Sequence, residues 1–308
     1  MTISNFRVVV VGMGVQGKKR AKFAFNDLVA KVDVDKNNLD ADYNNLNDIS
    51  HKDYDAVLLC TPDDVKYEIL KTILNSKKHV LVEKPLFVKN KEELVELQNI
   101  ANRNKVILYT AYNHRFEPHF INMKNLLINK ALGKIFRLRM FYGNGTSGLV
   151  KQSEWRDQGS GVLLDIGSHL LDTLIFWFGD KNIDIKHSNS FCFENLSPDH
   201  AILTGKIDNI FIELEVSLLS WKNDFICDVI GSKGSAHISS LCKWGPSKFI
   251  IRKRILPAGK PDENITTLIK PDPTWEQEYI YFKKLIKNKV KTNLSSDIKI
   301  FNILKDNI

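Results

Sequence analysis

A run of four valines followed by a glycine-rich turn constrains the fold of this 308-residue chain most strongly. The run, Val8–Val11, predicts a buried β-strand, and Gly12-Met-Gly14-Val15-Gln16-Gly17 follows it directly, with a helix pattern beyond. In this context the spacing G-x-G-x-x-G is the fingerprint of a dinucleotide-binding turn, in which glycines allow close approach to a pyrophosphate. We therefore expect this segment to open a doubly wound α/β domain and to bind a dinucleotide.

A second motif, Glu83-Lys84-Pro85, ends another apolar run, His79–Val82. Ligands of an open parallel sheet bind at the carboxyl ends of its strands, so Lys84 is expected beside a cofactor held by the first turn. Pro85 restricts the backbone of Lys84 to an extended conformation and keeps the chain from entering a helix there. The motif thus predicts an ammonium group held at the strand edge by a stiff backbone.

Alternating strand and helix patterns predict a parallel, doubly wound sheet in the first part of the chain. The expected strands are residues 8–11, 28–34, 56–60, 79–82 and 106–111, with helices at 18–28, 64–75 and 91–102. A chain of this length exceeds the size of a single core. We expect a dinucleotide-binding Rossmann domain over residues 1–118 and a second, substrate-binding and oligomerisation domain over residues 119–308.

The later pattern predicts an α+β domain with a large, mainly antiparallel, open-faced sheet. Helices are expected at residues 120–130 and 162–178, and strands at 135–142, 183–193, 200–207, 210–219, 225–230, 236–239 and 248–255. Asp208-Asn209 and Gly231–Gly234 have the composition of hairpin turns. A last helix, from Trp275 to about Lys287, is expected to pack against this sheet.

Asp33 closes the second expected strand. Its spacing in the sequence from the glycine turn is close to that at which a carboxylate binds the adenosine ribose. A carboxylate at this position accepts hydrogen bonds from the ribose hydroxyls and repels the 2′-phosphate of NADP. Asp35 adds to the repulsion, whereas Lys36 would favour the phosphate. We expect the cofactor to be NAD rather than NADP.

Asp165, His169 and Asp172 share one face of an otherwise apolar helix pattern. Burying such a polar stripe is costly unless it is hydrogen-bonded or lines a cleft, and a purely structural network is the alternative. Hydride transfer from a carbinol carbon needs a base for the hydroxyl proton and a cation that polarises the oxygen. We expect His169, oriented by Asp165, to be the base and Lys84 to be the cation.

Cations and an aromatic ring are expected near the same site. Arg115 follows the fifth strand, and the loop before the polar stripe carries Lys151, Trp155 and Arg156. Guanidinium groups bind carboxylate or phosphate through two donors at once, so the pattern favours a nucleotide sugar or sugar acid over a neutral cyclitol. The alternative is structural salt bridges, for which the nearby carboxylates are Glu117, Glu154 and Asp157.

Composition and charge exclude several other classes of protein. No apolar run is long enough to span a bilayer, and the first residues lack the pattern of a signal peptide, so we expect a cytoplasmic protein without a membrane partner. The net charge of +8 comes from scattered lysines without a basic block, so we expect no nucleic-acid partner. The four cysteines include no C-x-x-C pair, so we expect reduced thiols and no metal.

Taken together, these motifs resemble the Gfo/Idh/MocA oxidoreductases, the glucose-fructose oxidoreductase and inositol dehydrogenase type, over essentially the whole chain. The resemblance rests on Gly12-x-Gly14-x-x-Gly17, Asp33, Cys60-Thr61-Pro62, Lys78-His-Val-Leu-Val-Glu83-Lys84-Pro85, Tyr112-Asn113-His114-Arg115-Phe116-x-Pro118 and Gly159-Ser-Gly161-Val-Leu-x-Asp165-x-Gly167-x-His169-x-x-Asp172.

The resemblance implies roles for individual residues. Lys84 and His169 are implied to be catalytic, and Asp165 to bind the substrate or to tune His169. The cofactor-binding residues that it implies are Gly12, Gly14, Val15, Gln16, Gly17, Asp33, Thr61, Pro62, Glu83 and Lys84, with the nicotinamide near the last two. The substrate is expected near Asn113, Arg115, Trp155, Arg156, Asp165 and His169.

Two features depart from the family pattern. A histidine commonly follows the Thr-Pro pair of the third strand at a short interval, and here that position is Lys66, so a cofactor-side contact is expected to be lost or altered. The sequence also ends at Ile308 soon after the last helix pattern, which argues against oligomer contacts made by a C-terminal arm. A homodimer or homotetramer formed through the open sheet face is the expectation that remains.

Three functions fit these features. The leading one is an NAD-dependent dehydrogenase that oxidises a secondary hydroxyl of a sugar, sugar acid, cyclitol or nucleotide sugar. A redox-neutral glycoside hydrolase that uses bound NAD transiently needs the same base and cation, so the sequence does not separate the two. A non-catalytic NAD-binding sensor on the same fold is disfavoured because Lys84 and His169 are both present.

Overall fold

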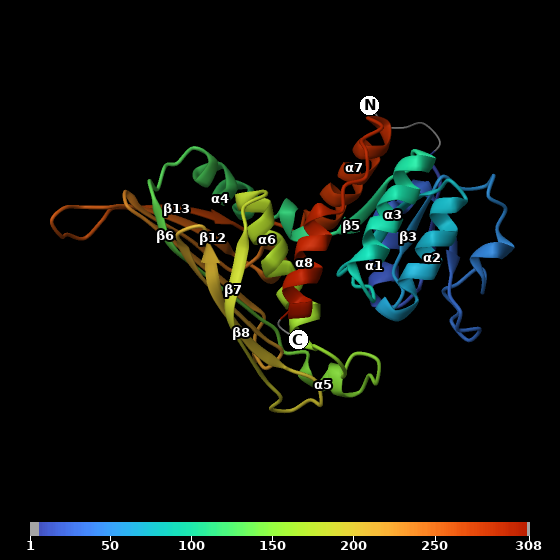
Figure 1. Cartoon of the computed structure of the whole chain (residues 1–308), viewed down its shortest axis with the longest axis horizontal. Coiled ribbons are helices and arrows are strands. Elements are labelled where there is room, and N and C mark those ends of the chain that lie inside the picture. Colours follow the sequence, from blue (N-terminus) through green and yellow to red (C-terminus); the bar gives the residue numbers. More distant parts are fainter. Residues whose placement is uncertain (1–5, 307–308) are drawn as a thin grey trace. The chain divides into compact units, whose positions relative to one another are not determined.

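The computed structural model describes residues 6–306, and within that range the chain forms two compact units. The first unit runs to Asn113 and takes in Trp275–Asn302, and the second comprises His114–Thr274 and residues from Ile303. Each unit has its own β-sheet, so the two are described in turn (Figure 1). Within the described residues, no helix combines the length and the apolar character needed to cross a membrane.

Five parallel strands form the sheet of the first unit, in the order β2-β1-β3-β4-β5. The strands are β1 (Val8–Val11), β2 (Leu28–Val32), β3 (Ala56–Leu59), β4 (His79–Glu83) and β5 (Leu108–Ala111). The predicted parallel, doubly wound sheet is confirmed. The strand order reverses between β1 and β3, so the switch point at which such sheets bind ligands lies at the carboxyl ends of these two strands.

Helices cover both faces of this sheet, which is why its strands are near-continuous apolar runs. The helices are α1 (Val15–Ala24), α2 (Asp63–Asn75), α3 (Lys91–Asn104), α7 (Thr274–Lys287) and α8 (Ser295–Asp306). One apolar cluster joins α2, α3 and the start of α8 to side chains such as Val9 and Leu59. A second cluster joins α1 and α7 to the opposite face through side chains such as Val10 and Leu58.

The position of α7 corrects an expectation. The helix was expected to pack against the second sheet, but Tyr279 and Phe282 are buried in the core of the first unit with Val10 and Leu58. The amphipathic pattern of α7 shows that one of its faces is buried, but it does not specify which of two sheets covers that face. α8 was not among the expected helices, and it places Phe301 in the other apolar cluster of the same unit.

Eight strands form the sheet of the second unit, in the order β13-β12-β11-β10-β6-β9-β8-β7. Only the pair β6 and β9 is parallel, so the sheet is mainly antiparallel, as predicted. The strands are β6 (Ile135–Gly143), β7 (Ile183–Phe191), β8 (His200–Ile207), β9 (Ile210–Ser217), β10 (Asp224–Gly231), β11 (Gly234–Ser239), β12 (Ser247–Lys253) and β13 (Glu263–Leu268). The helices are α4 (Pro118–Ile128), α5 (Ser147–Lys151) and α6 (Ser168–Phe178).

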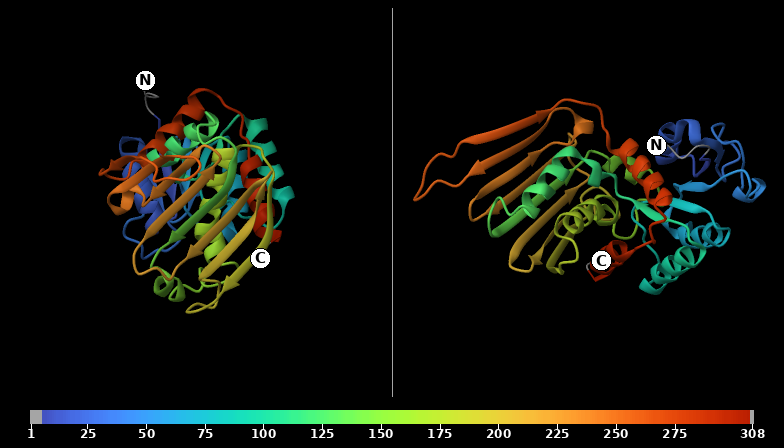
Figure 2. Two further views of the ribbon diagram at one scale, coloured as in Figure 1. Left: turned by 90° about the vertical axis from the view of Figure 1, so that its left-hand side faces the viewer. Right: turned by 90° about the horizontal axis from the view of Figure 1, so that it is seen from above.

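Helices α4 and α6 lie on one face of this sheet, and no helix among residues 6–306 covers the opposite face (Figure 2). Phe120 of α4 packs against Phe225 of β10 and against Trp177 of α6, which ties both helices to the sheet. Along β9 the even-numbered residues are buried, whereas Phe211 is exposed and Glu213 partly exposed. The alternation that predicted one covered and one open face is therefore confirmed.

Candidate active site

The glycine-rich turn lies at the switch point of the first sheet, and its glycines are required for different reasons. Gly12 has φ of +89°, and a Cβ there would lie 2.7 Å from the carbonyl oxygen of Cys60, which follows β3. A Cβ on Gly17 would lie 1.9 Å from the carbonyl oxygen of Gly12. A Cβ on Gly14 would meet nothing within 4 Å, so the constraint at this position does not come from the protein itself.

Asp33 is anchored to that turn. Its carboxylate accepts hydrogen bonds from the backbone N–H of Met13 at 2.6 Å and of Asp35 at 3.0 Å, and from the side-chain amide of Asn38 at 3.2 Å. The carboxylate is therefore held beside the start of α1 rather than being free to rotate in solvent. Asn38 was not anticipated, because nothing in the spacing indicates that this loop folds back onto Asp33.

The residues at this edge fit a dinucleotide. The N-cap residue of α1, Gly14, makes no side-chain capping bond, so the backbone N–H groups of the first turn face the loop and can bind phosphate oxygens. Thr61, two residues beyond the end of β3, has a buried hydroxyl oxygen with no hydrogen-bond partner among residues 6–306. A buried hydroxyl without a partner is costly, and a ligand bound at the switch point would supply one.

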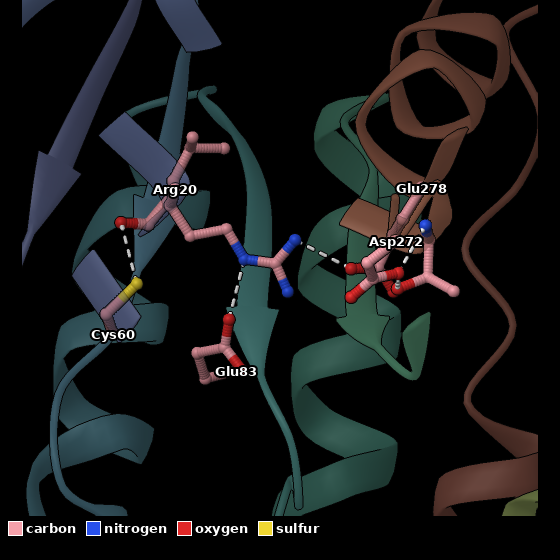
Figure 3. Close-up of polar contacts among 7 residues, drawn as sticks. Arg20, Cys60, Glu83, Asp272 and Glu278 are labelled. Atoms are coloured by element: carbon pink, nitrogen blue, oxygen red, sulfur yellow. Dashed lines mark hydrogen bonds and ion pairs between the residues drawn. The ribbon is translucent and has the colours of Figure 1, made fainter. Parts of the chain in front are cut away.

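A buried ion-pair network surrounds Glu83, the residue before Lys84. Arg20 of α1 donates to the Glu83 carboxylate at 2.6 Å and to Glu278 of α7 at 2.6 Å (Figure 3). The Arg20 guanidinium also lies 4.2 Å from the ring centroid of Trp275. Burial opposes the charge on Arg20, but Glu83 and Glu278 outweigh it and raise the pKa of this group. Neither Arg20 nor Glu278 belongs to a motif that the sequence singles out.

Lys66 occupies the position at which the family pattern has a histidine and at which an altered cofactor-side contact was expected. It lies close to Glu83. Its ammonium group is buried and donates to the backbone carbonyl oxygens of Glu83 and Pro85. Lys84 itself is half-buried at the carboxyl end of β4, beside β3 and the Cys60-Thr61 turn. Burial raises the pKa of the Cys60 thiol, with Glu83 adding to the rise, so Cys60 stays protonated.

In the second unit, the polar stripe lies on a helix that is not regular. One α-helix was expected over residues 162–178, but residues Leu163–Gly167 form a π-helical turn and α6 begins only at Ser168. Turns of this kind are frequent at functional sites. Asp165 lies within the π-turn, and His169 follows in the first turn of α6.

His169 is packed against another histidine. The rings of His114 and His169 are stacked, with centroids 4.0 Å apart and planes inclined at 19°. Both residues are buried, and Tyr142 of β6 lies against both rings. His114 was part of the motif that suggested the family but was given no role, since the spacing of two distant segments does not reveal a ring stack.

Both arginines expected near the substrate form ion pairs with carboxylates of the polar stripe. Arg115 donates through Nε and Nη2 to the buried carboxylate of Asp172, and Arg156 donates to Asp165 at 3.2 Å. These partners are not Glu117, Glu154 or Asp157, the carboxylates that were considered for structural salt bridges. Burial raises the pKa of Asp172, and Arg115 offsets part of that rise. Trp155 is 59% exposed in the loop before the π-turn.

The sequence-predicted residues thus gather into two sets, one on each unit. The first unit brings Lys84 and the cofactor-binding residues Gly12, Gly14, Val15, Gln16, Gly17, Asp33, Thr61, Pro62 and Glu83 to the carboxyl edge of its sheet, with Asn113 at the end of the unit. The second unit brings together Asp165, His169, Arg115 and Arg156, linked by the ion pairs and the ring stack.

Comparison with known families agrees with this arrangement. Residues 6–112 match the family described as "Oxidoreductase family, NAD-binding Rossmann fold", and residues 120–237 match the "GFO/IDH/MocA C-terminal domain". The two matches together cover more than half of the chain. The protein therefore belongs to the Gfo/Idh/MocA oxidoreductase family.

Three individual proteins show which enzymes this chain is similar to. The chain is 26% identical over 212 residues to glucose-6-phosphate 3-dehydrogenase of Bacillus subtilis (strain 168), covering 61% of this chain and 60% of the relative. It is 29% identical over 128 residues to scyllo-inositol 2-dehydrogenase (NADP(+)) IolW of the same organism, covering 41% of this chain and only 35% of the relative. A levoglucosan dehydrogenase in complex with NADH shares the fold, with a TM-score of 0.81, 16% identity, and coverage of 99% and 96% of the two chains.

Proposed function

We propose that this protein is an NAD-dependent dehydrogenase that oxidises a secondary hydroxyl group of a sugar, sugar acid, cyclitol or nucleotide sugar. The observation that supports this most directly is the position of Lys84 at the carboxyl end of β4, on the sheet edge that also carries Gly12 and Thr61. Dinucleotides bind at this edge in doubly wound folds. The sugar and cyclitol dehydrogenases among the relatives agree with the proposal.

The proposed roles follow from the chemistry of the side chains. NAD, when bound, supplies the hydride acceptor. The imidazole of His169 takes the proton of the substrate hydroxyl, and the ammonium of Lys84 stabilises negative charge on the reacting oxygen. Asp165 binds the substrate or orients His169, and Asn113 contacts the substrate.

The test is net formation of NADH by the purified protein on free sugars, sugar acids, cyclitols and nucleotide sugars. We expect Lys84→Met and His169→Asn each to lower kcat by about 10²-fold or more while NAD binding is kept. Lys89→Met, which removes an exposed lysine from the following loop, is the matched control and should retain activity. Turnover close to that of the wild type in both site variants contradicts the assignment.

The same assay separates the other two functions. Cleavage of a glycoside without net NADH would identify a redox-neutral hydrolase, which needs the same base and cation. Tight NAD binding without turnover of sugars or glycosides would identify a sensor.

We also propose that the open face of the second sheet forms a homodimer or homotetramer interface. This face carries the exposed apolar side chains Phe211 and Ile226, beside an ion pair between Arg139 and Glu213 at 3.0 Å. Such a mixture of apolar side chains and complementary charge suits a self-complementary surface. Light scattering should give a mass above that of the monomer, and Phe211→Asp should lower it; a monomeric wild type at micromolar concentration rules the interface out.

A cytoplasmic location is the last part of the proposal. Cys227 and Cys242 are buried as free thiols, and such thiols persist in a reducing compartment. Fractionation of cells that express the protein should recover it with cytoplasmic markers, and recovery with secreted proteins would contradict the location.

A further inference from the structure

Lys66 is a buried lysine whose donors are all directed at the segment around Lys84 or at its own helix. Its side chain is 2% exposed, and Nζ donates to the carbonyl oxygen of Glu83 at 2.8 Å and to that of Pro85 at 3.0 Å. A third hydrogen bond reaches the carboxylate of Asp63, in the first turn of α2. An ammonium group has three N–H donors, so each of them has an acceptor.

The two carbonyl groups that Lys66 binds flank Lys84 on either side. The side chain of Glu83 is bound independently by Arg20 at 2.6 Å, and Arg20 is in turn paired with Glu278. Two buried cations from different helices therefore hold the residue before Lys84, one through its backbone and one through its carboxylate. Of these two cations, Lys66 also binds the carbonyl group of Pro85, the residue after Lys84.

We infer that Lys66 is a positioning residue for Lys84. By binding the carbonyl groups of Glu83 and Pro85, it fixes the peptide plane that precedes the Lys84 Cα and the one that follows the Pro85 Cα. The short segment that contains Lys84 is thus held at both ends, and with it the direction in which the Lys84 side chain leaves the backbone. The inference rests on the proposed function of Lys84, because positioning affects catalysis only if Lys84 contacts the reacting oxygen.

The chemistry of the side chain explains why a lysine suits this position. A neutral imidazole has one N–H donor, so it could bind only one of the two carbonyl groups. An ammonium binds both and keeps a third donor for Asp63. Its burial is costly, and the cost is offset only while the charge is fully hydrogen-bonded, as it is here.

The experiment compares Lys66→Met, which keeps the length of the side chain without its donors, with Lys66→Arg, which keeps a cation and several donors. Lys71→Met is the matched control, since Lys71 lies on the same helix and pairs with Glu96 at the surface at 3.2 Å. We expect Lys66→Met to lower kcat by about tenfold to 10²-fold, because small displacements of a catalytic group cost this much. KM and the Kd for NADH should stay within about threefold, with partial recovery in Lys66→Arg and no change in Lys71→Met.

A second measurement does not need turnover. Reductive methylation with ¹³C labels lysines that solvent can reach, which include the half-buried Lys84, and the Lys84 signal is assigned by its loss in Lys84→Arg. Lys66→Met should shift or split this signal, and Lys71→Met should not. If Lys66→Met proves unstable, the same signal is measured in Asp63→Asn, which removes the charge that anchors Lys66 but leaves the lysine in place.

The outcomes separate the inference from the proposed function. A shifted Lys84 signal in a protein that oxidises no sugar supports positioning and removes the dehydrogenase. A wild-type signal and wild-type kcat in Lys66→Met overturn the inference and leave the dehydrogenase standing. Equal losses of kcat and NADH affinity in Lys66→Met, with an unchanged Lys84 signal, reduce Lys66 to a structural residue and also overturn it.

Discussion

The imidazole rings of His114 and His169 are stacked at a centroid distance of 4.0 Å, in the buried interior of the second unit. Tyr142 lies 5.5 Å from the first ring and 6.1 Å from the second. Next to the stack, Arg115 and Asp172 form an ion pair between the same two segments. Two adjacent contacts thus hold the helix that carries His169 against the Asn113–Phe116 turn, and one of them lies directly on the ring of the proposed base.

The stack leads to a first prediction. His114→Ala removes the surface that fixes the plane of the His169 ring, and we expect kcat to fall by about tenfold or more, with NAD binding unchanged. His114→Phe keeps a flat ring in the same place and should retain most of the activity. Steady-state kinetics of both variants tests this, and equal activity of His114→Ala and wild type would show that the stack does not orient His169.

The parts of this fold that depend on local patterns could be predicted from the sequence. β1 is four valines buried on both faces, and β9 alternates buried and exposed residues, so each pattern is explained by burial alone. β13 was not predicted because its side chains are almost all exposed and show no burial pattern. Its strand conformation depends on its pairing with β12, which is not a local property of the sequence. The π-turn was missed because an α-helical period is the default for any apolar helix pattern.

The contacts of the site were harder to predict than its residue types. Gly12, Asp33 and Lys84 follow strands whose order can be inferred, so their common edge could be predicted. Arg20 could not be distinguished from the other cations of α1, because its partner Glu278 lies far away in the sequence. The role of Lys66 could not be predicted for a different reason: its acceptors include backbone carbonyl groups, which carry no sequence signal.

The second prediction concerns the choice of cofactor. Asp33 follows β2, and its carboxylate is held beside the start of α1, where it would repel a 2′-phosphate and accept bonds from the ribose hydroxyls. We expect the wild type to bind NAD more tightly than NADP. Asp33→Ala should weaken NAD binding by about tenfold and reduce the preference for NAD over NADP. Glu92→Gln, which removes an exposed acid from the first turn of α3, is the control. Fluorescence titration with both reduced cofactors measures the effect; a wild-type preference for NADPH would show that Asp33 does not play this part.

The third prediction concerns pH. Burial lowers the pKa of His79 from 6.5 to about 4, and its Nδ1 accepts a hydrogen bond from the N–H of Ile107 at 2.9 Å. Between these two pH values the folded state binds fewer protons than the unfolded state, so stability is complete above 6.5 and falls as the pH drops towards 4. The loss is at most about 3 kcal/mol. Urea unfolding at several pH values should show a smaller dependence in His79→Gln, and identical pH profiles would contradict the assignment.

The last prediction concerns the charge of the substrate and separates the two arginines. Arg115 is committed to the buried Asp172, whereas Arg156 makes one hydrogen bond to Asp165, and its Nε and Nη1 have no partner among residues 6–306. Arg156 therefore keeps donors for an anionic substituent, with Lys151 and Trp155 in the same loop.

We expect the wild type to have a higher kcat/KM on an anionic sugar, such as a sugar phosphate or sugar acid, than on its neutral counterpart. Arg156→Gln should reduce this ratio by about tenfold, because one charge-assisted contact is lost. Arg137→Gln, which removes an arginine from the open sheet face, should leave the ratio unchanged. If the wild type prefers the neutral sugar and Arg156→Gln does not alter that preference, Arg156 serves only to hold Asp165, and the charge of the substrate is recognised elsewhere or not at all.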